Sequence, residues 1–194
     1  MMQPSKTFYT STQSFIIERM LPEEESSSSI AISYHVHQTQ YGSALVANTR
    51  KGICFIAFGD GVKTLEELKM RFPKGIFHRE ETELQFSAVG AIDQYGALSV
   101  ALPLHLKGSD FEMRVWQALL QTQKGMLTTY GEIARTIGAP QAVRAVASAI
   151  GRNPIACLIP CHRVLRADGK LGGYHWGIDI KRKMIDWERA SILR

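Results

Sequence analysis

The chain has 194 residues, of which 45% are hydrophobic and 21% are charged, proportions typical of a globular protein with a sizeable buried core. It contains no run of about 18 apolar residues and no N-terminal apolar block of signal-peptide length, so we expect no membrane partner and a cytoplasmic location. Its three cysteines form no disulfide framework, which also favours a reducing compartment.

Charge is divided unevenly along the chain. Residues 1–106 carry nine Lys/Arg and eleven Asp/Glu, a net charge of −2, whereas residues 107–194 carry fourteen and seven, a net charge of +7. A basic half joined to a mildly acidic half indicates that the basic half meets a polyanion. A solvated basic surface without a partner is the alternative.

We predict a flexible N-terminal extension over residues 1–29. Its last part, 23–29, is a run of three glutamates and four serines, and such a polar, low-complexity composition favours disorder or a linker. The apolar triplet at 15–17 leaves room for a short docking segment.

Residues 30–106 are predicted to form a small α+β domain. Alternating apolar and polar residues predict three strands, and helical spacing with Thr64 as N-cap predicts the first of two helices. The predicted elements are three strands, two helices and a final edge strand, at 30–37, 43–48, 53–58, 64–72, 83–94 and 99–104.

Two histidines of this domain could bind a metal. His35 and His37 alternate along one strand and therefore point to the same face of the sheet. A metal site needs further ligands, and the sequence shows no matching third and fourth. We therefore predict no metal and no other cofactor.

A second domain is predicted over residues 107–194. Asp110 is expected to cap a helix that ends at residue 120, and Thr129 to cap the next helix, with Glu132 completing a capping box. A Gly–Ala–Pro turn then leads to a helix over 141–150. Two short helices joined by a tight turn are typical of a helix-turn-helix.

The helix at 141–150 carries one arginine among small residues. Such a smooth helix can approach a nucleic acid closely, and Arg144 can reach phosphates or enter a base stack. Alternatively, the alanines pack against the preceding helix. Both uses are compatible, because they need opposite faces.

The segment Leu158–Val164 places a thiol beside an imidazole and a guanidinium. A neighbouring base and cation lower the pKa of a thiol, so Cys161 is the candidate nucleophile. A base also needs an orienting partner, for which the last helix offers Asp186 and Glu188. Cys157, in an apolar run, is expected to be a buried structural thiol.

The run Ile159–Val164 resembles the active-site signature of the O6-alkylguanine-DNA alkyltransferases. The segment 144–149, Asn153 and the segment 173–177 resemble that family's accompanying motifs. The likeness extends over about residues 30–188 and is strongest from Phe111 onward. It implies a ribonuclease-H-like N-terminal domain followed by a winged-helix DNA-binding and active-site domain.

The resemblance also implies a reaction. An alkyl group would pass from O6-alkylguanine, and from O4-alkylthymine, in double-stranded DNA to Cys161, once per molecule. His162 would deprotonate the thiol through a water, and Glu188 would orient the imidazole. The implied substrate contacts are Tyr130, Asn153, Val164, Tyr174 and His175, and the implied DNA contacts are Gln141, Arg144 and Ala145. Of these, Arg144 would fill the gap that the flipped nucleotide leaves in the duplex.

Two positions differ from some relatives. Ala156 stands where they carry a proline and Trp176 where they carry a glycine, so we predict poor transfer of benzyl-sized groups. We expect a monomer. The zinc site of some relatives is not predicted, because the N-terminal region lacks a four-ligand Cys/His set.

Two other functions are compatible with parts of the sequence. A non-catalytic winged-helix DNA-binding module would leave Cys161, His162 and Glu188 unused. A cysteine hydrolase would use the thiol and imidazole but leave the basic half without a purpose.

Overall fold

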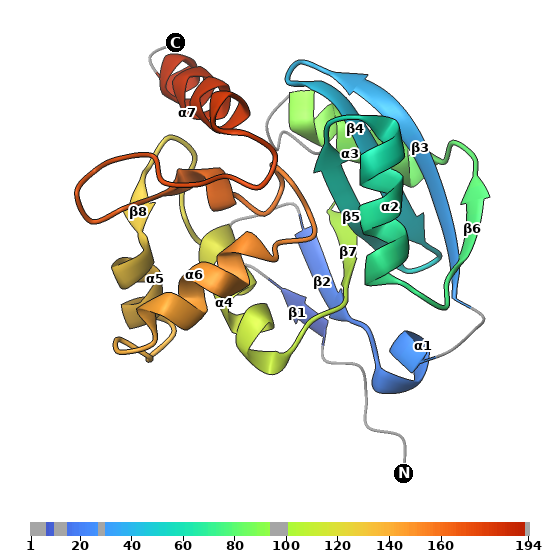
Figure 1. The fold of residues 1–194 in the computed structure, drawn as a ribbon, viewed down its shortest axis with the longest axis horizontal. Helices are drawn as coiled ribbons and strands as arrows, with labels where there is room; N and C mark the ends of the chain where they lie inside the picture. Colours follow the sequence, from blue (N-terminus) through green and yellow to red (C-terminus); the bar gives the residue numbers. More distant parts are fainter. Residues whose placement is uncertain (1–6, 10–14, 27–29, 94–100, 193–194) are drawn as a thin grey trace. The chain divides into compact units, whose positions relative to one another are not determined.

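The computed structural model describes residues 7–9, 15–26, 30–93 and 101–192, and the protein is mixed α/β (Figure 1). The chain divides into two compact units, Met1–Gly108 and Ser109–Arg194. Among the described residues, no helix combines the length and the apolar character needed to cross a membrane.

The N-terminal unit is built on one mixed sheet whose strand order is β1-β2-β7-β5-β4-β3-β6. Strands β3, β4 and β5 form an antiparallel meander, whereas β2–β7, β5–β7 and β3–β6 are parallel pairs. The predicted strands over 30–37, 43–48 and 53–58 are confirmed. The strands are β1 (Thr7–Tyr9), β2 (Phe15–Arg19), β3 (Ala31–Thr39), β4 (Gly42–Thr49), β5 (Gly52–Phe58), β6 (Ile76–Arg79) and β7 (Leu102–Leu106).

Three helices accompany this sheet: α1 (Pro22–Ser26), α2 (Gly61–Arg71) and α3 (Glu83–Asp93). Every residue of β5 is buried, so both faces of the sheet are covered at its centre. The predicted N-cap of α2 is wrong. Asp60 caps the helix by accepting from the Val62 amide, whereas Thr64 is buried one turn later and its hydroxyl donates to the Asp60 carbonyl.

Two predictions on this unit are wrong where the structure describes them. Residues 15–26 are not a flexible extension, because β2 pairs with β7 along its whole length and buries Ile17 completely. For the same reason β7 is not an edge strand, since β2 and β5 flank it. Other parts of these predictions fall on residues 1–6, 10–14, 27–29 and 94–100, outside the described residues.

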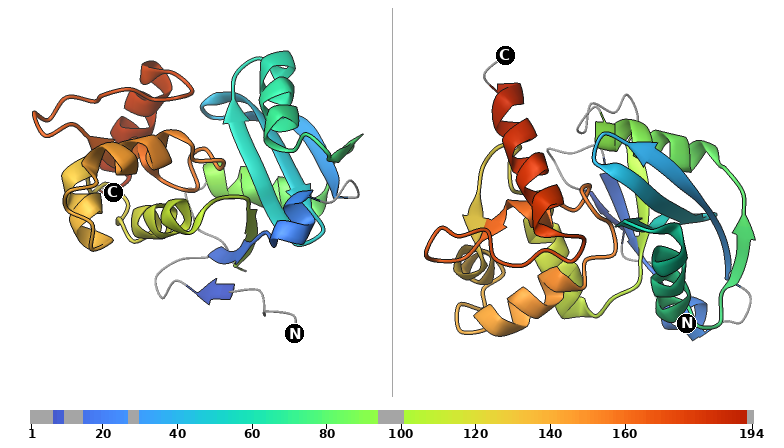
Figure 2. Two further views of the ribbon diagram at one scale, coloured as in Figure 1. Left: turned by 60° about the horizontal axis from the view of Figure 1, so that its bottom comes forward. Right: turned by 45° about the horizontal axis from the view of Figure 1, so that its top comes forward.

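The C-terminal unit is mainly helical (Figure 2). Two short parallel strands, β8 and β9, pair within it. Its elements are α4 (Asp110–Leu120), β8 (Thr128–Thr129), α5 (Tyr130–Thr136), α6 (Val143–Gly151), the 3-10 helix η1 (Cys161–Arg163), β9 (Val164–Leu165) and α7 (Ile178–Ile192).

The helix starts in this unit follow from local side-chain chemistry. The Thr129–Glu132 capping box of α5 is confirmed. For α4, the predicted cap Asp110 is wrong by one residue, because Ser109 accepts from the Glu112 amide and Glu112 reaches back to Ser109. Helix α6 begins two residues later than predicted, so Gln141 lies in the turn before it.

The buried face of α6 fixes its orientation. Val146, Ala149 and Ile150 are buried, and the Trp116 indole of α4 donates to the Ala149 carbonyl at 3.0 Å. Arg144 and Ala145 are exposed. The two uses expected of this helix therefore fall on different faces.

The pairing of β2 with β7 predicts that Ile17 contributes to stability. Ile17→Ala leaves a cavity in a fully buried position and should lower the free energy of unfolding by about 2–5 kcal/mol. The matched variant Ile76→Ala, at a side chain that is 47% exposed, should change it by less than about 0.5 kcal/mol. Urea denaturation of both variants tests this, and equal small effects would show that residues 15–19 are loosely attached.

Candidate active site

Cys161 lies at the start of η1, directly after an apolar approach. Residues 153–164 are all buried, and Cys161 is only 5% exposed. The predicted structural thiol Cys157 is buried as well. It has a φ of 68°, which few residues other than glycine adopt, so the chain turns sharply just before Cys161.

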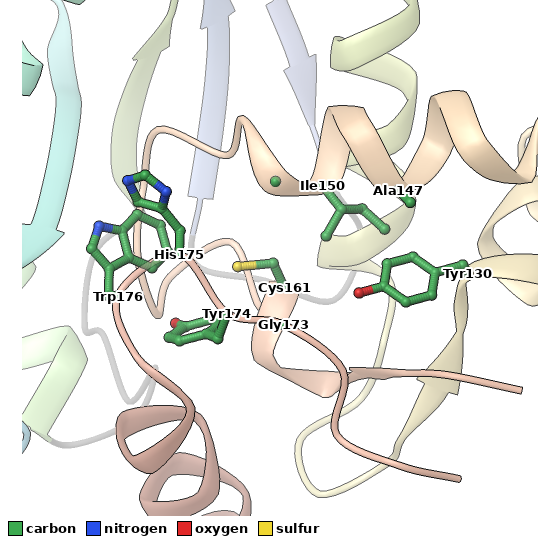
Figure 3. Close-up of a pocket in the computed structure, with 9 residues that line it drawn as sticks. Tyr130, Ala147, Ile150, Cys161, Gly173, Tyr174, His175 and Trp176 are labelled. Atoms are coloured by element: carbon green, nitrogen blue, oxygen red, sulfur yellow. The ribbon is translucent and has the colours of Figure 1, made fainter. Parts of the chain in front are cut away.

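A cavity of about 270 Å³ opens onto the thiol (Figure 3). Figure 3 shows the Cys161 side chain between Tyr130 on one side and His175 and Trp176 on the other. The cavity is lined by residues from α5, α6, η1 and the loop before α7: Tyr130, Ala147, Ile150, Gly151, Cys161, Gly173, Tyr174, His175 and Trp176.

Asn153 connects the end of α6 to the thiol. Its side-chain amide donates to the Cys161 Sγ at 3.1 Å and to the Ile159 carbonyl at 2.9 Å, while its Oδ1 accepts from the Ile155 amide. Asn153 therefore holds the turn and also orients the sulfur.

Burial dominates the acidity of this thiol. Removal from water raises the pKa of Cys161 to about 11, although the Asn153 hydrogen bond and the charge of Lys181 both oppose the shift. The expectation of a lowered pKa for Cys161 is therefore wrong, because burial outweighs the neighbouring groups that lower it. The Arg163 guanidinium is committed to Glu188.

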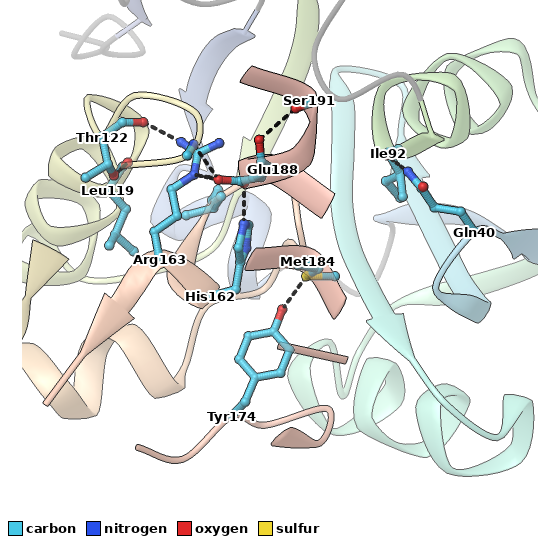
Figure 4. A network of polar contacts seen from close by, with 12 residues as sticks. Gln40, Ile92, Leu119, Thr122, His162, Arg163, Tyr174, Met184, Glu188 and Ser191 are labelled. Atoms are coloured by element: carbon cyan, nitrogen blue, oxygen red, sulfur yellow. Dashed lines mark hydrogen bonds and ion pairs between the residues drawn. The ribbon is translucent and has the colours of Figure 1, made fainter. Parts of the chain in front are cut away.

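His162, Arg163 and Glu188 form one buried network (Figure 4). Glu188 Oε1 lies 2.7 Å from His162 Nε2 and accepts from Arg163 Nε at 3.0 Å, while Oε2 accepts from the Gly125 amide at 2.7 Å. Arg163 also donates to the Thr122 carbonyl. The choice between Asp186 and Glu188 is thus settled in favour of Glu188, since Asp186 is exposed.

This network fixes the tautomer of His162. An ionised carboxylate only accepts hydrogen bonds, so Nε2 of His162 carries the proton and Nδ1 keeps its lone pair. Burial lowers the pKa of His162, against the opposing effect of Glu188, so the imidazole is neutral near pH 7. The site therefore pairs a neutral thiol with a neutral base.

Lys181 is a site residue that the sequence interpretation missed. Its Nζ donates to the Val164 carbonyl at 2.7 Å and to the carbonyl of Leu171, which ties β9 to the loop that borders the cavity. Burial lowers the pKa of Lys181 to about 8. The sequence did contain a sign that Lys181 is buried on the same helix face as Glu188. This face has the i, i+3, i+4, i+7 spacing and consists of Lys181, Met184, Ile185 and Glu188.

The predicted substrate contacts are only partly gathered around the cavity. Tyr130, Tyr174 and His175 line it, whereas Val164 does not. The Val164 carbonyl accepts from Lys181 Nζ, and the Cys161 carbonyl accepts from the Val164 amide. The Tyr174 hydroxyl lies 3.5 Å from the Met184 sulfur.

The predicted DNA-binding residues are all exposed. Gln141, Arg144 and Ala145 are exposed on α6 and the turn before it, and Ala147 and Ile150 of the same helix line the thiol cavity. A second cavity, of about 690 Å³, has two exposed arginines that were not predicted, Arg135 and Arg166. Tyr130 lines both cavities.

The raised pKa of Cys161 predicts slow reaction with small thiol reagents. With a pKa of about 11, roughly one thiol in ten thousand is ionised at pH 7, so the rate should rise about tenfold per pH unit up to pH 10. Iodoacetamide labelling, followed by peptide mass spectrometry and compared with Cys161→Ser, measures this. A plateau at or below pH 8 would contradict the burial argument.

Known proteins resemble both units. Residues 110–190 match the family model "6-O-methylguanine DNA methyltransferase, DNA binding domain". The chain is 38% identical over 168 residues to the Escherichia coli bifunctional transcriptional activator/DNA repair enzyme Ada, an alignment that covers 84% of this chain and 47% of Ada. The chain thus spans about half the length of the curated relative that it matches there.

Other relatives match over nearly their whole length. The methylated-DNA–protein-cysteine methyltransferase of Methanosarcina barkeri is 38% identical over 162 residues, which cover 82% of this chain and 98% of that protein. The crystal structure of Mycobacterium tuberculosis OGT in complex with DNA matches with a TM-score of 0.67 and 32% identity, over 81% of this chain and 93% of that one. The chain belongs to the methylated-DNA–protein-cysteine methyltransferase family.

Proposed function

We propose that this protein repairs DNA by transferring a methyl or other alkyl group from guanine O6 to the sulfur of Cys161. The observation that carries the proposal is the buried thiol of Cys161, at the wall of a cavity beside the His162–Glu188 pair. The relatives' names and the DNA complex of the mycobacterial structure support DNA as the substrate.

The proposed reaction is an in-line displacement. His162 Nδ1 takes the thiol proton through a water, and the Cys161 Sγ attacks the alkyl carbon as the bond from that carbon to O6 breaks. Tyr130 donates a hydrogen bond at guanine N3, and the proton released from the thiol ends on the base, which leaves as neutral guanine. The sulfur keeps the alkyl group as a thioether, a poor leaving group, so each molecule acts once.

The high pKa of the Cys161 thiol is compatible with a reaction in which the thiol loses its proton only after the substrate has bound. A thiol that stays protonated until a substrate fills the cavity resists other electrophiles, and a neutral His162 is ready to accept the proton. Glu188 then stabilises the imidazolium, as a buried carboxylate does when it orients a general base. Arg163 holds that carboxylate in place.

We further propose that the C-terminal unit is a winged-helix DNA-binding domain and that the N-terminal unit is a ribonuclease-H-like structural domain. Arg144 enters the gap left by the extruded nucleotide, and Gln141 and Ala145 contact the minor groove beside it. The exposed Arg135 and Arg166 add phosphate contacts near Tyr130. The protein acts as a monomer, and O4-alkylthymine is a second substrate.

Methyl transfer is tested by intact-mass measurement. After incubation with duplex DNA containing O6-methylguanine, the protein should gain the mass of one methyl group, located on Cys161, and Cys161→Ser should gain none. Glu188→Gln should slow the transfer by at least about tenfold, because the neutral amide supports an imidazolium poorly. Duplex that is bound but keeps its methyl group would instead indicate a non-catalytic binding module.

The cavity wall predicts a limit on the size of the group transferred. Trp176 lines a space of only about 270 Å³, so O6-benzylguanine should react slowly, and Trp176→Gly should accelerate that reaction more than the reaction with O6-methylguanine DNA. The remaining active thiol, measured over time with each substrate, gives both rates. Rapid inactivation of the unchanged protein by O6-benzylguanine would contradict the limit.

A further inference from the structure

A cluster of metal-binding side chains lies in the N-terminal unit. His35 and His37 come from β3, and Glu81 follows β6. One potential ligand atom from each residue lies within 4.8 Å of those from the other two. None of the three residues lines the thiol cavity.

The strand register brings the third ligand to the two histidines. Strands β3 and β6 are parallel, with Tyr34 opposite Arg79, and the Glu80 amide continues the ladder by donating to the Tyr34 carbonyl. Glu81 therefore leaves the sheet beside His35, and its Oε1 lies 3.5 Å from His35 Nδ1. This nitrogen is buried and makes no hydrogen bond to any described residue.

A buried amide network sets the tautomer of His37. The Gln85 amide nitrogen donates to Asn48 Oδ1 at 3.0 Å, so Gln85 Oε1 faces His37 Nε2, at 3.1 Å, as an acceptor. Nε2 of His37 must therefore carry the proton, which leaves Nδ1 with its lone pair. Thr82 also donates to Asn48 and so holds the amide in this orientation.

This arrangement is the one that metal-binding histidines use. Such a histidine commonly donates its other ring N–H to an oxygen acceptor, which orients the ring and raises its basicity. Gln85 provides that acceptor and is completely buried, and His37 itself is only 8% exposed. A surface ion pair between His35 and Glu81 alone would not need His37 prepared in this way.

We propose that His35, His37 and Glu81 bind one Zn²⁺ ion, with a water in the fourth position. Two imidazoles and a carboxylate are a common zinc ligand set. Zinc bonds of about 2.0–2.2 Å at tetrahedral angles place two ligand atoms about 3.3–3.6 Å apart, so ligand atoms that lie up to 4.8 Å apart must close by up to about 1.3 Å. The exposed Glu81 side chain can rotate to supply this movement.

The proposed zinc site differs from the prediction, made from sequence, that the protein binds no metal. No metal was expected, because the third ligand is 44 residues from His37 along the chain and only the pairing of β3 with β6 brings it close. The ion would fasten the connection between β6 and α3 to β3. Its role is therefore structural, and it does not depend on the proposed alkyl transfer.

Cobalt titration of the full chain tests the site. The Cys161→Ser variant is used as the background, so that no reactive thiol contributes a near-ultraviolet thiolate–cobalt band. Co²⁺ should produce a saturable visible absorption at one equivalent per chain, and Zn²⁺ should abolish it. His35→Ala and Glu81→Gln should each weaken binding at least tenfold.

Matched variants separate this site from surface binding. His78→Ala and Glu83→Gln change exposed residues of the same types nearby and should leave Co²⁺ binding unchanged. Zn²⁺ should also raise the melting temperature of the parent and of both controls, but not of His35→Ala or Glu81→Gln. No saturable band, or equal weakening by the control variants, would overturn the proposal.

Discussion

The buried carboxylate of Glu188 is the constraint on which the C-terminal unit depends. An ionised carboxylate away from water is tolerated only when its oxygens are fully engaged, and here His162, Arg163 and the Gly125 amide engage them. These partners come from η1 and from the loop after α4, so satisfying one charge fixes three segments together. Arg163 is the charged partner among these three, so its loss would leave an uncompensated charge in the interior. The His162 imidazole, which is the base in the proposed reaction, is thus oriented by the same contacts that hold the unit together.

Around this fixed centre, the thiol is held but not activated. Asn153 and Lys181 approach it from opposite ends of the cysteine segment, and each also binds backbone carbonyls that shape the cavity. Burial nevertheless outweighs both and raises the pKa of Cys161. In the proposed reaction, the substrate is therefore selected when it binds and not during alkyl transfer. Only a substrate that fills the cavity can bring the thiol, the base and the alkyl carbon together.

Local patterns were predictable and long-range pairings were not. The Thr129–Glu132 capping box and the strands of the meander follow from a few neighbouring residues, and the segment around Cys161 is specific enough to indicate its family. By contrast, nothing near Phe15 shows that this strand pairs with one 87 residues later, and Glu81 gives no local sign of its approach to His35. Lys181 was missed because its partners are backbone carbonyls that only the fold brings near.

Helix α6 places exposed residues next to residues that border the thiol cavity. Arg144 and Ala145 are exposed on one side, and Ala147 and Ile150 border the thiol cavity on another. Residues three positions apart on a helix are neighbours, so a duplex lying against Arg144 would also lie beside Ala147 and the cavity. Cys161 is only 5% exposed at the wall of that cavity, so a base that remains stacked in the duplex could not bring its O6 substituent to the sulfur. The burial of the thiol therefore makes complete rotation of the nucleotide out of the duplex a precondition for the proposed chemistry.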